Sequence, residues 1–380
     1  MSDQFTKVTS ENYFQRIGSS FGGMVFGIIL ILIACAMLLW NEGRAVDAKR
    51  SLNAGRQAVV SLSSTSPLPA NEGKLVHLTG QATASAPLAD ADVGVTFVNT
   101  LTLFRKVEMF QWVQESRSAT KDKVGGTQET TTTYTYTKKW SDTAQDATGF
   151  AQPDGHANPA MPFTSSVTYA ADAKLGGFAL PEDILNQLVS ETLVAPDTIP
   201  TGWRKVDTTL YKGTGTTEAP VVGDMRVTYA PVASGTVISA VGKQAGVTLE
   251  GWRSSNSNYD VLIAKQGSVS GNLMIQEQKQ SEGILTWVLR TLGTLLNVGA
   301  FALLMGPLRA LGNVIPLVAS IIGGGIGLIA FGLGSGVSLI MMAIAWFTFR
   351  PLVSLGLILA AGAAWYVFKN KRGAAASQPS

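Results

Sequence analysis

The most constraining feature of this chain is its acid-free C-terminal part, because no Asp or Glu occurs from residue 283 to the end at residue 380. Long apolar segments separated by isolated basic residues are typical of membrane helices. Only 14% of all residues are charged, against about 25% in average chains, so a wholly soluble globular protein is not expected. The charges of this part are Arg290, Arg309, Arg350, Lys369, Lys371 and Arg372.

Four apolar runs are long enough to cross a membrane. The first, residues 21–40, is uncharged, and at about 1.5 Å per residue it matches a hydrocarbon core of about 30 Å. A signal peptide is the alternative, because Leu32-Ile33-Ala34-Cys35 resembles a lipoprotein cleavage site. The sequence stays apolar up to Trp40, however, which favours an uncleaved anchor. The other predicted spans are 284–306, 324–349 and 352–368, with 307–323 as an interfacial or re-entrant segment.

Four spans place both termini on one side of the membrane. The basic tail within residues 369–380 predicts that this side is cytoplasmic, as is then the N-terminal tail 1–20. Basic residues after the first run (Arg44, Lys49, Arg50 and Arg56) favour the opposite orientation. Long translocated domains largely escape this charge rule, which reduces the weight of those four residues.

The region between the first two spans, residues 41–283, is predicted to be a large non-cytoplasmic β domain. Apolar and polar residues alternate in 74–80, 94–103, 107–115, 130–140, 225–229, 236–241 and 259–265, as in half-buried strands. We predict an antiparallel barrel-like or sandwich-like fold, with two lobes as one possibility. Residues 181–191 predict one short helix with Ile184, Leu185 and Leu188 on its apolar face. The polar segments 116–129 and 141–162 are predicted to be loops.

The composition leaves little material for catalysis. One Cys and two His exclude a disulfide framework and a cysteine-based zinc site, so neither a metal nor a cofactor is predicted. His156 with Asp154 could orient an imidazole, but a polar turn is the favoured interpretation of that loop. The domain has 21 basic and 24 acidic residues, which disfavours nucleic acid as a partner.

Two further patterns suggest contacts. Glu108 and Trp112 share one face of an expected strand with Lys106 and Phe110, where they serve either recognition or, as favoured, cross-strand stabilisation. Arg290 lies one turn inside the second span, and snorkelling beside Trp287 is favoured over a functional intramembrane charge. Small residues at a spacing of four (Gly323 with Gly327, and Gly332 with Gly336) allow close helix approach, either within one chain or between copies.

In-order motifs over nearly the whole chain resemble the transmembrane protein 43 family, also called LUMA. The motifs are Asn41-Glu42-Gly43-Arg44, residues 71–77, residues 107–113, Gly155-His156, residues 222–227 around Asp224, and Arg350-Pro351-Leu352. The resemblance implies four spans, one large lumenal or periplasmic domain and cytosolic termini. It carries over no catalytic residue.

The leading hypothesis is a non-enzymatic membrane scaffold that self-associates and organises other membrane proteins or a lipid microdomain. Its expected partners are membrane lipids, other copies of itself and other membrane proteins. The absence of Asn-x-Ser/Thr acceptors suits a bacterial inner membrane, whereas a eukaryotic member is expected in the endoplasmic reticulum or inner nuclear membrane. The alternative is an accessory enzyme or carrier acting on lipids or envelope polymers. A channel is disfavoured because the last three spans lack acids and a polar stripe.

Overall fold

The computed structural model describes residues 3–62, 66–123, 127–312, 316–351 and 354. Contacts divide the chain into two units, which are described separately. The β unit comprises residues 1–9, 51–120 and 130–278, and the helical unit comprises 10–50, 121–129 and 279–380. The predicted span 352–368 and tail 369–380 lie outside the described residues.

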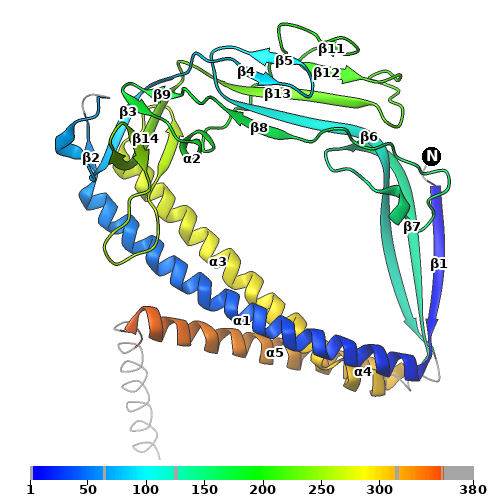
Figure 1. The fold of residues 1–380 in the computed structure, drawn as a ribbon. Helices are drawn as coiled ribbons and strands as arrows, with labels where there is room; N and C mark the ends of the chain where they lie inside the picture. The colour runs from blue at the N-terminus through cyan, green and yellow to red at the C-terminus, as the bar shows by residue number, and fades with distance from the viewer. Residues whose placement is uncertain (1–2, 63–65, 124–126, 313–315, 352–353, 355–380) are drawn as a thin grey trace, which may run out of the picture. The chain divides into compact units, whose positions relative to one another are not determined.

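The β unit contains two seven-stranded sheets and a two-stranded ribbon (Figure 1). The first sheet has the order β1-β7-β6-β13-β12-β11, with β8 also paired to β6. Its strands are β1 (Asp3–Glu11), β6 (Thr100–Asp122), β7 (Gln128–Ser141), β8 (Ser166–Tyr169), β11 (Arg204–Val206), β12 (Thr209–Lys212) and β13 (Met225–Ala233).

The second sheet has the order β16-β14-β15-β10-β9-β3-β2, and β14 also pairs with β3. Its strands are β2 (Val60–Ser61), β3 (Leu75–Thr83), β9 (Lys174–Leu175), β10 (Phe178–Ala179), β14 (Val237–Ala245), β15 (Thr248–Glu250) and β16 (Ile263–Gln266). The ribbon consists of β4 (Leu88–Asp90) and β5 (Val95–Phe97), and two short 3₁₀ turns, η1 and η2, cover Pro69–Asn71 and Ala147–Gly149.

Both sheets contribute to one hydrophobic core. Val76, Leu78 and Ile238 come from the second sheet, while Val107 and Val227 come from the first. The predicted alternation in 105–111 is confirmed, because Arg105, Val107, Met109 and Gln111 are all buried. A mainly antiparallel β fold with membrane helices is thus the observed fold class.

Residues 116–122 and 128–129 form strands, so the loop prediction was wrong for these residues. β6 extends to Asp122 and β7 begins at Gln128. The polar side chains of this hairpin bond across the strands, with 2.9 Å between Ser118 Oγ and Thr132 Oγ1 and 3.2 Å between Thr120 Oγ1 and Thr130 Oγ1. Such cross-strand pairs stabilise a strand with few apolar residues. In the predicted loop 141–162, by contrast, residues 142–162 contain no strand or α-helix and only the short turn η2.

The predicted helix 181–191 is much shorter than expected. α2 covers only Glu182–Leu185, although Ile184, Leu185 and Leu188 are fully buried as predicted. Pro181 precedes the helix, and Asn186 N–H bonds to the carbonyls of Glu182 and Ile184 at its C-terminus. One turn is therefore enough to bury this apolar face.

Helix α1 is longer than the first apolar run and covers Tyr13–Ala58. Asn12 and Gln15 form a reciprocal capping box before it, with 2.9 Å from Gln15 N to Asn12 Oδ1 and 3.0 Å from Asn12 N to Gln15 Oε1. After residue 40 the helix continues because Ala, Arg, Lys and Leu are good helix formers and no Pro intervenes. Residues 41–58, expected in the β domain, are thus helical.

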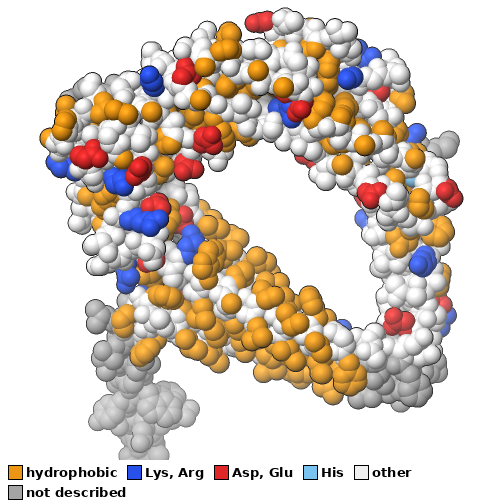
Figure 2. Space-filling view, viewed as in Figure 1, with side chains coloured by type: hydrophobic (Ala, Val, Ile, Leu, Met, Phe, Trp, Pro, Cys, Tyr) orange, Lys and Arg blue, Asp and Glu red, His pale blue; other side chains and the backbone are white. Residues whose placement is uncertain are grey.

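The remaining helices are α3 (Gly271–Leu304), α4 (Gly306–Gly312) and α5 (Pro316–Phe349). Among the described residues, three helical segments are long and apolar enough to cross a membrane: Gly18–Ala58, Gly271–Leu304 and Gly325–Phe349. Apolar side chains dominate the visible surface of these helices (Figure 2), and Leu32, Trp287 and Leu328 are each more than half exposed. Such a surface is stable in lipid rather than in water.

A candidate packing site between three helices

Residues 41–44 of α1 form contacts with both α3 and α5 in the helical unit. We define the Glu42 cluster as Asn41, Glu42, Gly43 and Arg44 with their partners. Asn41 and Glu42 are completely buried. The cluster contains all four residues of the first predicted interaction motif. The partners are Glu282, Thr286 and Arg290 on α3, and Trp346 and Phe349 on α5.

Glu42 is the centre of this cluster. Arg290 donates to it from Nε at 2.5 Å and from Nη2 at 2.9 Å, and the Trp346 indole donates at 2.9 Å. The Arg290 guanidinium also lies 4.7 Å from the ring centroid of Trp287. A charge-assisted bidentate pair, stacked on an aromatic ring, is a favourable way to hold a buried carboxylate.

The neighbours of Glu42 join the same helices. Asn41 Nδ2 donates to the Thr286 carbonyl at 3.1 Å, and Arg44 forms an ion pair with Glu282. A Cβ added to Gly43 would lie 2.9 Å from Cζ of Phe349, so any larger residue here would push the Phe349 ring aside. The arrangement holds α1, α3 and α5 together and presents no open position for a reacting group.

The structure separates the glycines of α5 into two kinds. Gly327, Gly332 and Gly336 have open space where a Cβ would point, so they make no close contact with any described residue, which leaves contact between copies as the remaining prediction for them. The close contact is at Gly334, where a Cβ would lie 2.6 Å from the Val298 backbone of α3. Gly323 belongs to α5, but its surroundings lie outside the part of the chain that the structure describes in detail.

The end of α5 carries the last predicted motif. Arg350 N–H donates to the Trp346 carbonyl at 2.7 Å, and its guanidinium lies 5.8 Å from the Trp346 ring centroid. Pro351 is exposed. Arg350 therefore stacks on the same indole that bonds to Glu42.

In the β unit, His156 is buried in an aromatic cluster. Its ring stacks on Tyr136 at a centroid distance of 3.9 Å and meets the edge of Trp112 at 4.7 Å. Nδ1 lies 2.9 Å from the Gln152 carbonyl oxygen, and Nε2 lies 3.4 Å from Asp3 Oδ2. The ring nitrogens thus face Gln152 and Asp3 rather than Asp154, and this geometry favours a packing role over acid-base catalysis.

Asp224 and Glu108 stabilise the first sheet. The Asp224 carboxylate accepts hydrogen bonds from the backbone N–H groups of Thr214, Gly215 and Val221. It thereby satisfies backbone donors of the turn between β12 and β13. Glu108 lies opposite Arg226 on β13 and accepts from its Nε at 2.7 Å. Cross-strand stabilisation, the interpretation favoured for Glu108, agrees with this geometry.

The Glu108 pair gives acid sensitivity to the β unit. Burial alone would raise the pKa of Glu108, but hydrogen bonds and charges from Arg226 and Lys106 outweigh it and hold the pKa below the usual value. Because the folded-state pKa of Glu108 is depressed, the stabilisation is present above about pH 4.3, the unfolded value, and disappears as pH falls through the folded value.

Glu108→Gln should therefore unfold at a lower temperature than the parent protein at pH 7. The two unfolding temperatures should converge in acid, and a gap that does not depend on pH would contradict this origin.

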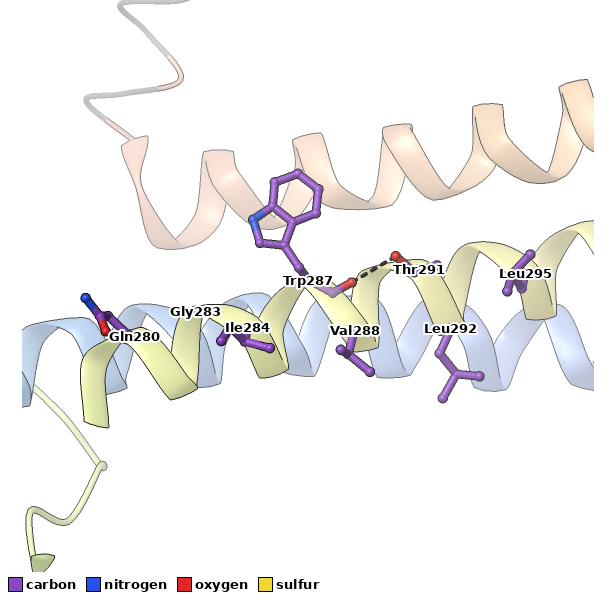
Figure 3. A pocket seen from close by; sticks show the side chains of 8 residues that line it. All are labelled: Gln280, Gly283, Ile284, Trp287, Val288, Thr291, Leu292 and Leu295. Carbon is purple, nitrogen blue, oxygen red and sulfur yellow. Dashed lines mark hydrogen bonds between the residues drawn. The ribbon is translucent and has the colours of Figure 1, made fainter. Parts of the chain in front are cut away.

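Within the described ranges, no group of three or more His, Cys, Asp or Glu is arranged to hold a metal ion. A shallow apolar groove of about 850 Å³ runs along α3 instead (Figure 3). Trp287, Val288 and Leu295 line it, and the Thr291 hydroxyl bonds back to the Trp287 carbonyl at 3.0 Å. The groove is therefore suited to hydrocarbon and not to a polar substrate.

Comparison with known proteins finds one family whose match covers residues of both the β unit and the helical unit. The sequence profile described as Transmembrane protein 43 matches residues 109–351, which include most of β6 and all of β13, α3 and α5. The chain belongs to the transmembrane protein 43 family. It is similar to Transmembrane protein 43 homolog of Drosophila melanogaster, with 30% identity over 90% of this chain and 93% of that protein.

Vertebrate relatives match over a similar extent. Transmembrane protein 43 of Mus musculus is 29% identical over 92% of this chain and 90% of its own length. The Homo sapiens protein is 29% identical over 90% of this chain and 88% of its own length. No solved structure matches this chain significantly. Membership of this family identifies a membrane protein, in agreement with its three apolar helices.

Sequence reasoning identified Glu42 but missed its partners. Arg290 was expected to snorkel beside Trp287, and the ring contact is present, yet the guanidinium also pairs with Glu42. The available signal was one acid just after the first apolar run and one base just inside the second. Opposite charges near the ends of two apolar segments predict a pair when the segments are antiparallel.

Proposed function

We propose that this protein is a non-enzymatic membrane scaffold that self-associates and organises neighbouring membrane proteins or lipids. The observation that carries this proposal is the exposed apolar surface of α5. Within the described residues, Leu328, Phe331 and Leu339 are 74%, 60% and 64% exposed, and Gly332 and Gly336 on the same helix have open space at their Cβ positions. Small residues with open space beside them permit close approach of a second helix.

The connection between the two units supports this role. The β unit is linked covalently to the helical unit through α1 before it and through α3 after it. A domain tethered at two points stays close to the membrane, which raises its effective concentration toward membrane neighbours. The described site residues are engaged in packing, which favours a scaffold over the alternative of an accessory enzyme or carrier.

Lipids are the second proposed partner class. The groove along α3 is lined mainly by apolar side chains, which Figure 3 shows along the helix, so acyl chains are its expected occupants. The proposed location is the inner membrane of a bacterium, supported by the absence of glycosylation acceptors and by a single cysteine. In a eukaryote it would be the endoplasmic reticulum or inner nuclear membrane.

Self-association through α5 can be tested by filling its open glycines. The double variant Gly327→Leu and Gly332→Leu should lower the mass of the protein in mild detergent, because the added side chains prevent close helix approach. Light scattering after size exclusion measures this mass. Gly299→Leu on α3 is the matched control, since that glycine also has open space around it. An unchanged mass of the double variant would refute this part of the proposal.

A further inference from the structure

The N-terminal strand β1 is an integral part of the β unit. It is the edge strand of the first sheet and pairs with β7 (Figure 1). The Phe5 ring stacks on Tyr134 of β7 at a centroid distance of 6.1 Å, and the Asp3 carboxylate lies 3.4 Å from His156 Nε2. The segment expected to be a separate cytoplasmic tail is therefore held by three kinds of contact with the β unit.

Both ends of α1 consequently lead to strands of the same unit. β1 ends at Glu11 immediately before α1, and β2 begins at Val60 immediately after it. β2 pairs with β3, which lies in the second sheet. If residues 21–40 crossed the bilayer, β1 and β2 would lie on opposite sides. Strands β6 and β7 would then have to cross the hydrocarbon core for β7 to pair with β1.

The strands concerned cannot enter that core. Lys7 and Glu11 on β1, and Glu115, Arg117 and Lys121 on β6, are charged, and a charged side chain at the bilayer centre is strongly unfavourable. β1 is also an open sheet edge, and unpaired backbone groups are not tolerated in lipid. The hairpin therefore lies in water or at the headgroups.

The hairpin tip lies beside the beginning of α1 in the helical unit. Residues 121–129 belong to that unit together with the beginning of α1. Glu11, Ser19, Gln128 and Arg309 are among the residues that line a pocket of about 350 Å³ there, together with apolar residues such as Leu303. The start of α1 thus lies beside the tip of the charged hairpin within the helical unit.

We propose that α1 enters and leaves the membrane from the same side, so that its apolar run 21–40 lies within one leaflet instead of crossing. The partner of this surface is the lipid of that leaflet. Phe26, Ile29 and Leu32 are 57%, 48% and 65% exposed and would contact acyl chains. Lys7 before the run and Arg44 and Lys49 after it then lie on the same side of the bilayer, so the charge rule need not choose between the two flanks of this run. The inference is independent of self-association.

Cysteine labelling tests this arrangement in the full-length protein. In a Cys35→Ser background, Lys7→Cys reports on β1 and Lys205→Cys reports on β11, and both side chains are exposed, so neither change should affect folding. A membrane-impermeant maleimide is applied to intact spheroplasts and to inverted membrane vesicles. We expect both cysteines to react from the same side with the same preference. Reaction from opposite sides would overturn the proposal.

A crosslink tests the strand pairing itself. Phe5→Cys with Tyr134→Cys should form a disulfide on mild oxidation in native membranes, because these residues stack on adjacent strands. Phe5→Cys with Lys205→Cys is the control and should remain reduced. If the Phe5/Tyr134 pair also remains reduced, β1 does not belong to the sheet in the membrane and the proposal is wrong.

Discussion

Glu42→Ala is expected to destabilise the protein by about 3–5 kcal/mol, because it leaves the Arg290 guanidinium buried without its counter-charge. Glu42 is fully buried and accepts two bonds from Arg290 and one from Trp346. The measurement is thermal or denaturant unfolding of the purified protein in detergent. The expected loss is a large part of the stability of a typical domain.

The double variant Glu42→Leu with Arg290→Met provides the control. Replacing both charges by apolar groups of similar volume is often neutral or stabilising, so this variant should recover most of the stability lost in Glu42→Ala. Trp346→Phe, which removes only one donor, should lose about 1–3 kcal/mol by leaving part of the carboxylate unbonded. Parent-like stability of Glu42→Ala would show that the pair does not hold the helices together.

Gly334→Ala is expected to destabilise the helical unit by about 1–3 kcal/mol through overpacking. A Cβ at this position would lie 2.6 Å from both Cα and N of Val298, so α3 and α5 would have to separate. The neighbouring bond from Asn297 Nδ2 to Ser338 Oγ, at 2.9 Å, would be strained by the same movement. Unfolding in detergent measures the effect, and Gly334→Leu should be worse than Gly334→Ala.

Gly332→Ala is the matched control and should change stability in the opposite direction. It has open space around its Cβ position, and Ala is favoured over Gly in a helix interior by up to about 1 kcal/mol. The two substituted glycines lie two residues apart on one helix, and the changes in stability should have opposite signs. If Gly334→Ala also stabilised the protein, the close contact between α3 and α5 would be contradicted.

The class of fold could be predicted because its signals are local. Apolar runs and period-two alternation are read from consecutive residues, and both α5 and the 105–111 strand agree with the structure. The boundaries of the helices could not be predicted in this way. Residues 41–58 lack the apolar run of a span, so this signal does not include them in α1, although their good helix formers allow the helix to continue.

Non-local pairing accounts for most of what the sequence did not reveal. The hairpin at 116–129 looks like a loop because its stabilisation comes from hydroxyl groups on the opposite strand. Strand β1 looks like a tail because its partner β7 lies more than a hundred residues away. Glu42 and Arg290 are separated even further, and polar partners at such distances leave no periodic pattern in a single sequence.

The most direct test of the scaffold proposal is the native mass of the full-length protein in nanodiscs. Co-purifying lipids and proteins would be identified by mass spectrometry in the same sample. We expect a defined homo-oligomer that retains several membrane lipids and specific membrane proteins. A monomer that carries one stoichiometric lipid or envelope-polymer fragment would contradict the scaffold and favour the enzyme or carrier.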